Sequence, residues 1–295
     1  MTVRNWSNYL WRLLINIWIQ GARPRTLPAA IAPVLVATAA AGSHRKPLEA
    51  LLALLVSLSL QVAVNYSNDY SDGIRGTDDN RIGPVRLTAS GLAPAESVKR
   101  AAILAFAFAS IIGIFVASLS SWWVILIGIF SIAAAWFYTG GANPYGYKGL
   151  GEVSVFIFFG VIATVGSYYV QTLQITWVAI AASIPMGALA CSLLAINNIR
   201  DRAQDLQVSK RTLAVRLGDT NSRRFLVVLL ISAYLFAGLT FKPWALITLV
   251  TVPVALGISR AVLKGANGRD LIPLLAKTGQ LQLLFALTFA IGLAL

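Results

Sequence analysis

Residues 65–79 read NYSNDYSDGIRGTDD and residues 197–205 read NNIRDRAQD, and each stretch adjoins a long apolar segment. Together they hold six of the eleven acidic residues of the chain. A carboxylate set against a lipid bilayer costs about 2.5 to 3.5 kcal/mol on insertion scales unless a cation compensates it. The two stretches therefore predict a cation-binding site at the boundary of a membrane.

The rest of the 295-residue chain is rich in apolar residues, which make up 57%, while only 12% are charged. A helix of about 20 apolar residues crosses a bilayer. Runs near that length predict an all-α polytopic membrane bundle of nine transmembrane helices, with spans at 27–42, 48–68, 101–119, 122–139, 151–170, 176–197, 225–241, 243–263 and 276–294. The first run is short and contains Pro28 and Pro33, so it is expected to be tilted or broken.

Lys and Arg residues favour one orientation of this bundle, because positive residues are retained on the cytoplasmic side. In the nine-helix arrangement, 21 of the 24 Lys and Arg residues fall on the side of the N-terminus. We therefore expect a multi-pass membrane protein with a cytoplasmic N-terminus and an outer C-terminus. The net charge of +13 is then a basic cytoplasmic face, and nucleic acid is not an expected partner.

The chain is predicted to have one transmembrane domain, residues 27–295, preceded by an interfacial segment, residues 1–26. Apolar residues recur at helical spacing in that segment, and Arg4 and Arg12 are available to lipid headgroups. No cleavable signal peptide is evident in it.

The carboxylates share helix faces within each acidic stretch. Asn68 and Asp72 are four residues apart, as are Asp201 and Asp205, while Asp69 and Asp72 are three apart. Two such faces turned toward one cavity would present four carboxylates and several amide oxygens. Oxygen ligands of this kind are the ones that Mg²⁺ prefers, with open positions left for substrate phosphates.

Basic residues surround the same place, which indicates a polyanion such as a diphosphate bridged by metal. Arg75, Arg81 and Arg86 follow the first acidic stretch, and Lys210 and Arg211 follow the second. Arg75 and Arg81 could instead serve only as orientation signals. Asp78 and Asp79 are either ligands or ordinary loop residues.

At these residues the chain resembles the UbiA superfamily of membrane prenyltransferases. The first family motif, NDxxDxxxD, corresponds to Asn68 through Gly76, and the second, DxxxD, to Asp201 through Asp205. Gly76 stands where the family has the last Asp of the first motif, and Asp78 is the candidate to replace it. Within the superfamily the menaquinone branch is most similar, through the stretches at 21–28, 64–78, 83–87, 138–141, 144–148, 151–152, 197–201 and 212–218.

The resemblance implies an Mg²⁺-dependent enzyme that transfers a polyprenyl group from polyprenyl diphosphate to 1,4-dihydroxy-2-naphthoate, with loss of diphosphate and CO₂, to form demethylmenaquinone. It also implies that the nine helices surround a central cavity open to the cytoplasmic side of a bacterial plasma membrane. The expected catalytic residues are Asp69, Asp72, Asp201, Asp205, Lys148 and Lys210. The expected metal ligands are Asn68, Asp69, Asp72, Asp201 and Asp205. The expected substrate-binding residues are Asn65, Asn68, Arg75, Asp78, Arg81, Arg23, Arg25, Tyr138, Arg211 and Asn198. Arg23 and Arg25 from the substrate-binding residues, and Lys148 from the catalytic residues, are candidates for orienting the acceptor carboxylate.

Two other functions are considered. The same chemistry could act on another aromatic acceptor, such as 4-hydroxybenzoate. In a different class, a cation-coupled transporter would use intramembrane carboxylates to bind Na⁺ or H⁺. Transporter sites usually lie near the bilayer midplane, whereas these Asp residues are predicted at the cytoplasmic ends of two helices.

Overall fold

The computed structural model describes residues 16–78, 82–83 and 85–295, and these residues form helices and no strand. Seven helices among them are long and apolar enough to cross a membrane: Pro47–Ile74, Ala95–Leu119, Gly151–Thr172, Trp177–Gln207, Leu213–Thr240, Pro243–Leu263 and Gly268–Ala294. Each coincides with a predicted span. The all-α membrane bundle expected from the sequence is thereby confirmed.

Two shorter apolar helices coincide with the first and fourth predicted spans: α2 (Pro28–Ala40) and α5 (Trp123–Phe137). The 13 residues of α2 rise about 20 Å, less than the roughly 30 Å of a bilayer core. Short 3-10 helices, η1 (Pro24–Thr26) and η2 (Gly42–His44), flank α2. Pro28 begins α2 and Pro47 begins α3, a position where the missing N–H of proline costs no hydrogen bond.

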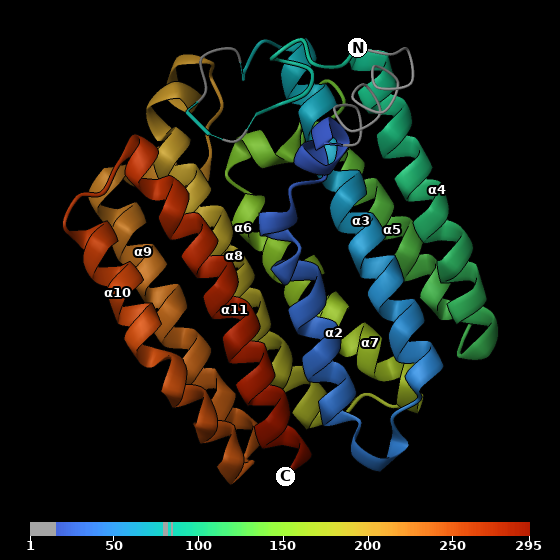
Figure 1. The fold of residues 1–295 in the computed structure, drawn as a ribbon. Helices are drawn as coiled ribbons and strands as arrows, with labels where there is room; N and C mark the ends of the chain where they lie inside the picture. Colours follow the sequence, from blue (N-terminus) through green and yellow to red (C-terminus); the bar gives the residue numbers. More distant parts are fainter. Residues whose placement is uncertain (1–15, 79–81, 84) are drawn as a thin grey trace, which may run out of the picture.

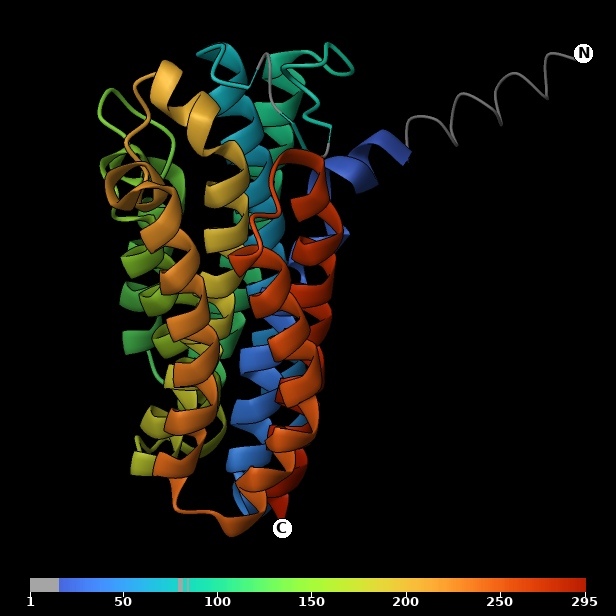
Figure 2. The ribbon, with the colours of Figure 1, turned by 90° about the vertical axis from the view of Figure 1, so that its left-hand side faces the viewer.

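The helices run roughly parallel to one axis (Figures 1 and 2). Helix α8 (Trp177–Gln207) is the most buried of the seven spans, and its buried face is rich in Ala, Gly and Ser. It packs against α2, α9 (Leu213–Ala237) and α11 (Leu271–Ala294), while α3 (Pro47–Ile74) packs against α4 (Ala95–Leu119). Helix α10 (Val252–Leu263) completes the C-terminal side, next to α9 and α11 (Figure 1).

A π-helical segment, Phe156–Ile162, joins α6 (Gly151–Val155) to α7 (Ala163–Thr172) and packs against α8. A Cβ atom on Gly160 would lie 2.5 Å from the Cα atom of Gly187 in α8. The two backbones can approach this closely only because both residues lack a side chain. This contact places the wide turn of the π segment against α8. Such π-helical turns are common at functional sites.

Both acidic stretches lie at the same end of the bundle. Helix α3 continues to Ile74 and α8 continues to Gln207, so Asp69, Asp72, Asp201 and Asp205 are all helical, as their spacing predicted. The carboxyl ends of these two helices lie together at the top of Figure 1, and the end of α11 lies at the bottom. The predicted interfacial segment lies partly outside the described residues, and its residues 16–22 are helical.

Candidate active site

A cavity of about 1000 Å³ lies between α2, α3, α5, the α6–α7 segment and α8. One end is polar, because the residues of both acidic stretches meet there: Asn65, Asn68, Asp72, Asn198, Asp201 and Asp205. The remainder is lined mainly by apolar residues of α5, the π segment and α7. The cavity thus joins a charged end to a long apolar space.

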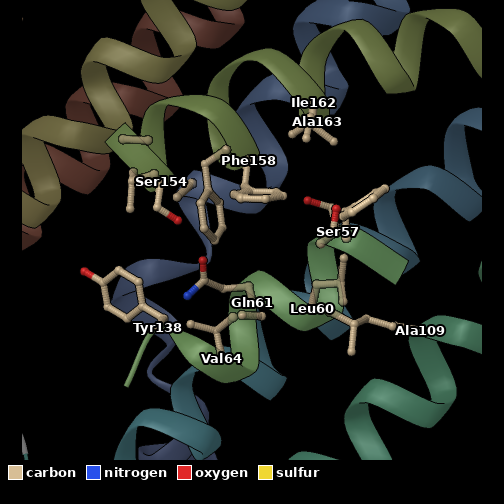
Figure 3. A pocket seen from close by; sticks show the side chains of 18 of the residues that line it. Ser57, Leu60, Gln61, Val64, Ala109, Tyr138, Ser154, Phe158, Ile162 and Ala163 are labelled. Atoms are coloured by element: carbon tan, nitrogen blue, oxygen red, sulfur yellow. The ribbon is translucent and has the colours of Figure 1, made fainter. Parts of the chain in front are cut away.

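Figure 3 shows the part of the cavity around Gln61. The side chains of Gln61, Tyr138 and Phe158 project into the same part of the cavity. The Gln61 amide donates to the Thr26 hydroxyl and to the Asn65 amide oxygen, each at 3.2 Å. The sequence analysis did not single out Gln61, although a buried polar residue one turn before Asn65 in an apolar run was a usable signal.

Lys210 joins the two acidic stretches. Its ammonium nitrogen lies 3.7 Å from Asp72 Oδ2 on α3 and 3.9 Å from Asp205 Oδ1 on α8. The Thr212 hydroxyl also donates to Asp205, at 3.4 Å. One carboxylate from each of the two helices therefore lies beside the same positive charge.

Asp72 has two further partners that come from loops. The Tyr147 hydroxyl donates to Asp72 Oδ1 at 2.6 Å, and the Arg86 guanidinium lies 3.6 Å from Asp72 Oδ2. Tyr147 belongs to the 3-10 turn η3 (Tyr145–Lys148). Burial and the neighbouring Asp72 charge raise the pKa of Tyr147 above its ordinary value, so the hydroxyl remains a donor.

The second acidic stretch is held by neighbours on and beside α8. Arg200 makes a two-bond ion pair with Asp201, at 2.7 and 2.8 Å. One turn earlier, the Asn198 amide donates to the buried Glu152 carboxylate at 2.9 Å. A fixed amide nitrogen leaves the Asn198 oxygen as the group available to the cavity.

The two asparagines of α3 are also fixed by hydrogen bonds. Asn68 accepts a hydrogen bond from the Thr139 hydroxyl at 2.8 Å. Asn65 donates to the Ala22 carbonyl at 2.8 Å and to the Thr26 hydroxyl at 3.0 Å. Both asparagines line the cavity, so the loops before α2 and after α5 are tied to its polar end.

Asp69 is placed differently from the other three carboxylates. It is fully buried, and it is absent from the residues that line the cavity. Its two oxygens accept the backbone N–H groups of Leu87 and Thr88, each at 2.9 Å. Arg23, which lines the cavity, lies 4.0 Å from Asp69.

Several other predicted residues also lie outside the cavity lining. Arg25, Lys148 and Arg211 are exposed. Arg75 donates to the backbone carbonyls of Thr139 and Gly141 and so fastens the loop after α5. Asp78 is buried and pairs with Arg86 at 2.9 Å. Arg81 lies outside the described residues.

The donor set suits a divalent cation in its chemistry. Asn68, Asp72, Asp201 and Asp205 supply oxygen atoms to one cavity, and a positive charge already lies between Asp72 and Asp205. As arranged, the described part of the chain has no group of three or more acidic, His or Cys side chains close enough to hold a metal.

Comparisons with known proteins identify the family of the chain. Residues 30–278 match the UbiA prenyltransferase family. The 1,4-dihydroxy-2-naphthoate octaprenyltransferase of Mycobacterium tuberculosis is 48% identical over 94% of this chain and 96% of its own length. A UbiA homolog from Aeropyrum pernix K1 has the same fold, with a TM-score of 0.69 at 14% identity over 90% of this chain and 96% of that one.

A second solved structure, a UbiA homolog from Archaeoglobus fulgidus, was determined bound to GPP and Mg²⁺. It covers 94% of this chain and 99% of its own length, with a TM-score of 0.66 at 14% identity. The resemblance read from the two Asp motifs is confirmed by the family match, which spans both of them. The chain belongs to the UbiA prenyltransferase family.

Proposed function

We propose that this protein transfers a polyprenyl group from polyprenyl diphosphate to 1,4-dihydroxy-2-naphthoate, a step of menaquinone biosynthesis. The high identity to a 1,4-dihydroxy-2-naphthoate octaprenyltransferase over nearly the whole chain supports the acceptor. Family membership favours prenyl transfer over the alternative of cation-coupled transport. The relatives' names favour the naphthoate over 4-hydroxybenzoate.

One observation carries the proposal: carboxylates of both Asp motifs converge on Lys210 at the polar end of a cavity whose remainder is apolar. A polyprenyl diphosphate has the same division, with a charged head and a long hydrocarbon tail. Each CH₂ group of the tail that leaves water contributes about 0.8 kcal/mol to binding. The cavity therefore fits the donor at both ends.

The charged end is suited to the leaving group. Breaking the allylic C–O bond concentrates negative charge on diphosphate, and Lys210 and Arg86 are the cations that line the cavity beside Asp72. Mg²⁺, held by Asn68, Asp72, Asp201 and Asp205, would neutralise further charge on the diphosphate. Asp69 was expected in this ligand set, and its contacts with Leu87 and Thr88 favour a different role for it.

The adjoining aromatic side chains are suited to the allylic cation. Tyr138, Phe158 and Phe159 line the cavity where the polar end meets the apolar space. Aromatic faces attract a cation without forming a bond to it. The ring carbon that bears the acceptor carboxylate then bonds to the allylic carbon, and the carboxylate leaves that carbon as CO₂, returning its bonding electrons to the ring. The product is demethylmenaquinone in its reduced form.

Arg23 is our candidate for orienting the acceptor carboxylate. It lines the cavity, unlike Arg25 and Lys148, which the sequence suggested for the same task. We further propose that the polar end faces the cytoplasm, as the Lys and Arg distribution predicts, and that residues 27–295 act as one domain with residues 1–26 at the membrane interface.

Purified protein, polyprenyl diphosphate, dihydroxynaphthoate and Mg²⁺ provide the test. We expect a prenylated naphthoquinol by mass spectrometry and one CO₂ released per product. Asp72→Asn and Asp205→Asn should each lower the rate at least about a hundredfold. Retention of the carboxylate in the product, preference for 4-hydroxybenzoate, or full activity with EDTA would contradict the proposal.

A further inference from the structure

We propose that Asp69 is a positioning residue that fastens the segment 85–90 to α3 and thereby places Arg86 in the cavity. The inference rests on the proposed function, because Arg86 is assigned there to the diphosphate. It gives Asp69 a task other than the metal ligation that its place in the first Asp motif suggests.

The contacts of Asp69 are those of an anchor. Both carboxylate oxygens are taken up by consecutive backbone N–H groups, those of Leu87 and Thr88, 18 and 19 residues further along the chain. A carboxylate that accepts backbone N–H groups makes charge-assisted bonds, which are about twice as strong as neutral ones. The carboxylate is fully buried and is not part of the cavity lining.

The packing around the segment supports the same role. Leu87 is fully buried against Ile17, Tyr66 and Ala93. Thr88 lies so close to α3 that a Cβ atom on Gly73 would be 2.5 Å from the Thr88 Cβ atom. Gly73 is one turn beyond Asp69 on α3. The segment 85–90 therefore contacts α3 at two adjacent points. One is the Asp69 carboxylate, which accepts two of its N–H groups, and the other is Gly73, which has no side chain to keep Thr88 away.

Arg86 immediately precedes the anchored residues. Its guanidinium lines the cavity, 3.6 Å from Asp72 and 2.9 Å from Asp78, and only 8% of the residue is exposed. Its carbonyl accepts the Ser90 N–H at 3.0 Å, which closes the turn that follows. Because one peptide unit separates Arg86 from Leu87, displacement of Leu87 and Thr88 moves the guanidinium out of the polar end.

Two variants separate anchoring from metal binding. The Asp69→Asn side chain has only one oxygen, and its NH₂ group cannot accept a hydrogen bond. At least one of the two hydrogen bonds from Leu87 and Thr88 is therefore lost. Gly73→Ala adds a methyl group against Thr88. It substitutes neither Asp69 nor its neighbour Arg23. Gly257→Ala is the matched control, since nothing lies within 4 Å of its new methyl group. Asp72→Asn is the control for a metal ligand.

Trypsin cleavage after Arg86, mapped by mass spectrometry, reports the position of the segment without any activity. We expect slow cleavage in the unchanged protein and in Gly257→Ala, and fast cleavage in both Asp69→Asn and Gly73→Ala. Both should raise KM for polyprenyl diphosphate about tenfold, because a displaced Arg86 no longer makes charge-assisted hydrogen bonds to the diphosphate. The Mg²⁺ concentration for half-maximal rate should stay within about twofold of the unchanged enzyme, whereas Asp72→Asn raises it.

The inference would be overturned if Asp69→Asn raised the Mg²⁺ requirement as Asp72→Asn does while Arg86 stayed protected from trypsin. Normal behaviour of Gly73→Ala would also count against it. In an Arg86→Ala background, Asp69→Asn should have only a small further effect on KM, because two residues that act through one group are not additive. Absence of prenyl transfer by the unchanged protein would refute the proposed function, and the trypsin result would still decide whether Asp69 holds the segment.

Discussion

Lys210 is the residue that links Asp72 and Asp205, one carboxylate from each Asp motif. Its ammonium group separates Asp72 and Asp205, which would otherwise repel each other across two helices. It also lies 4.9 Å from the centre of the Tyr147 ring, so its position is fixed from a third side. Lys210 therefore keeps Asp72 and Asp205 in place before a metal or a diphosphate binds.

Replacing Lys210 with Met should therefore make the protein depend on Mg²⁺ for stability. We expect a lower unfolding temperature in EDTA, and a larger rise on adding Mg²⁺ than in the unchanged protein, because the metal replaces the missing positive charge. Thermal unfolding in detergent measures both effects. Lys264→Met, on an exposed lysine, is the control. Equal Mg²⁺ stabilisation of Lys210→Met and the unchanged protein would contradict this role.

Tyr147 gives a prediction about pH. Its pKa is raised above the ordinary value of 10.0 by burial and by Asp72, so the hydroxyl stays protonated and keeps its bond to Asp72 below that pH. Tyr147→Phe should lower the free energy of unfolding by about 1.5 to 3 kcal/mol, as for a bond to a charged group. The difference between Tyr147→Phe and the unchanged protein should be constant from pH 7 to 9 and decline only above pH 10. A difference that already fades near pH 8 would be inconsistent with the raised pKa.

At the scale of elements, α8 combines structural and chemical tasks along its length. Its middle is buried among neighbouring helices through small residues, and its last turns carry Asn198, Asp201 and Asp205 into the cavity. The π segment and α8 meet at Gly160 and Gly187, just where the cavity lining includes Phe158 and Phe159. The position of these aromatic side chains therefore depends on the close approach of two backbones.

Gly160→Ala tests this contact. The added methyl group would lie 2.5 Å from the Cα atom of Gly187, so the helices must separate. Overpacking of this kind costs about 1 to 3 kcal/mol. We expect a lower unfolding temperature and slower prenyl transfer, whereas Gly257→Ala should leave both unchanged. An unaltered unfolding temperature in Gly160→Ala would show that the packing is less tight than described.

At the scale of the whole molecule, the cavity reaches the outer surface of the bundle along α5. Ile114, Trp123 and Phe130 line it and are more than half exposed. Helix α5 packs against α3 and α4, while α7 lines the other wall of the cavity. A polyprenyl tail that outgrows the cavity would leave between these walls into lipid, where its remaining length costs nothing.

Gly128→Trp should narrow that route. Gly128 lines the cavity, and nothing lies within 4 Å of a Cβ atom placed on it. We expect a long polyprenyl diphosphate to lose about tenfold or more in kcat/KM, while dimethylallyl diphosphate, whose tail is short, is affected little. Gly257→Trp, on an exposed face of α10, is the control. Equal loss for both donors would contradict a tail path along α5.

The orientation of the bundle can be measured with single cysteines, because Cys191 is buried. Ser43 and Ser209 are both exposed, and the prediction places them on opposite sides of the membrane. An impermeant maleimide should label Ser43→Cys in intact cells and Ser209→Cys only after the membrane is opened. The reverse pattern would place the active site on the outer side.

The sequence alone determined the all-helical membrane fold, the helical placement of both Asp motifs and the family. Hydropathy and helical spacing are local properties, so the apolar runs and the four-residue spacings were enough. The resemblance at Asn68, Asp72, Asp201 and Asp205 was equally local, and these residues do line one cavity.

Only the tertiary structure decided which charged residues reach that cavity. Asp69 and Asp72 differ by three positions on one helix, yet Asp72 faces the cavity and Asp69 faces a segment 18 residues away. Arg86 enters the site while Lys148 and Arg25 stay exposed. The positions of loop residues depend on contacts with distant parts of the chain. Helical spacing in the sequence does not predict such contacts. The direction of each side chain therefore followed from packing alone.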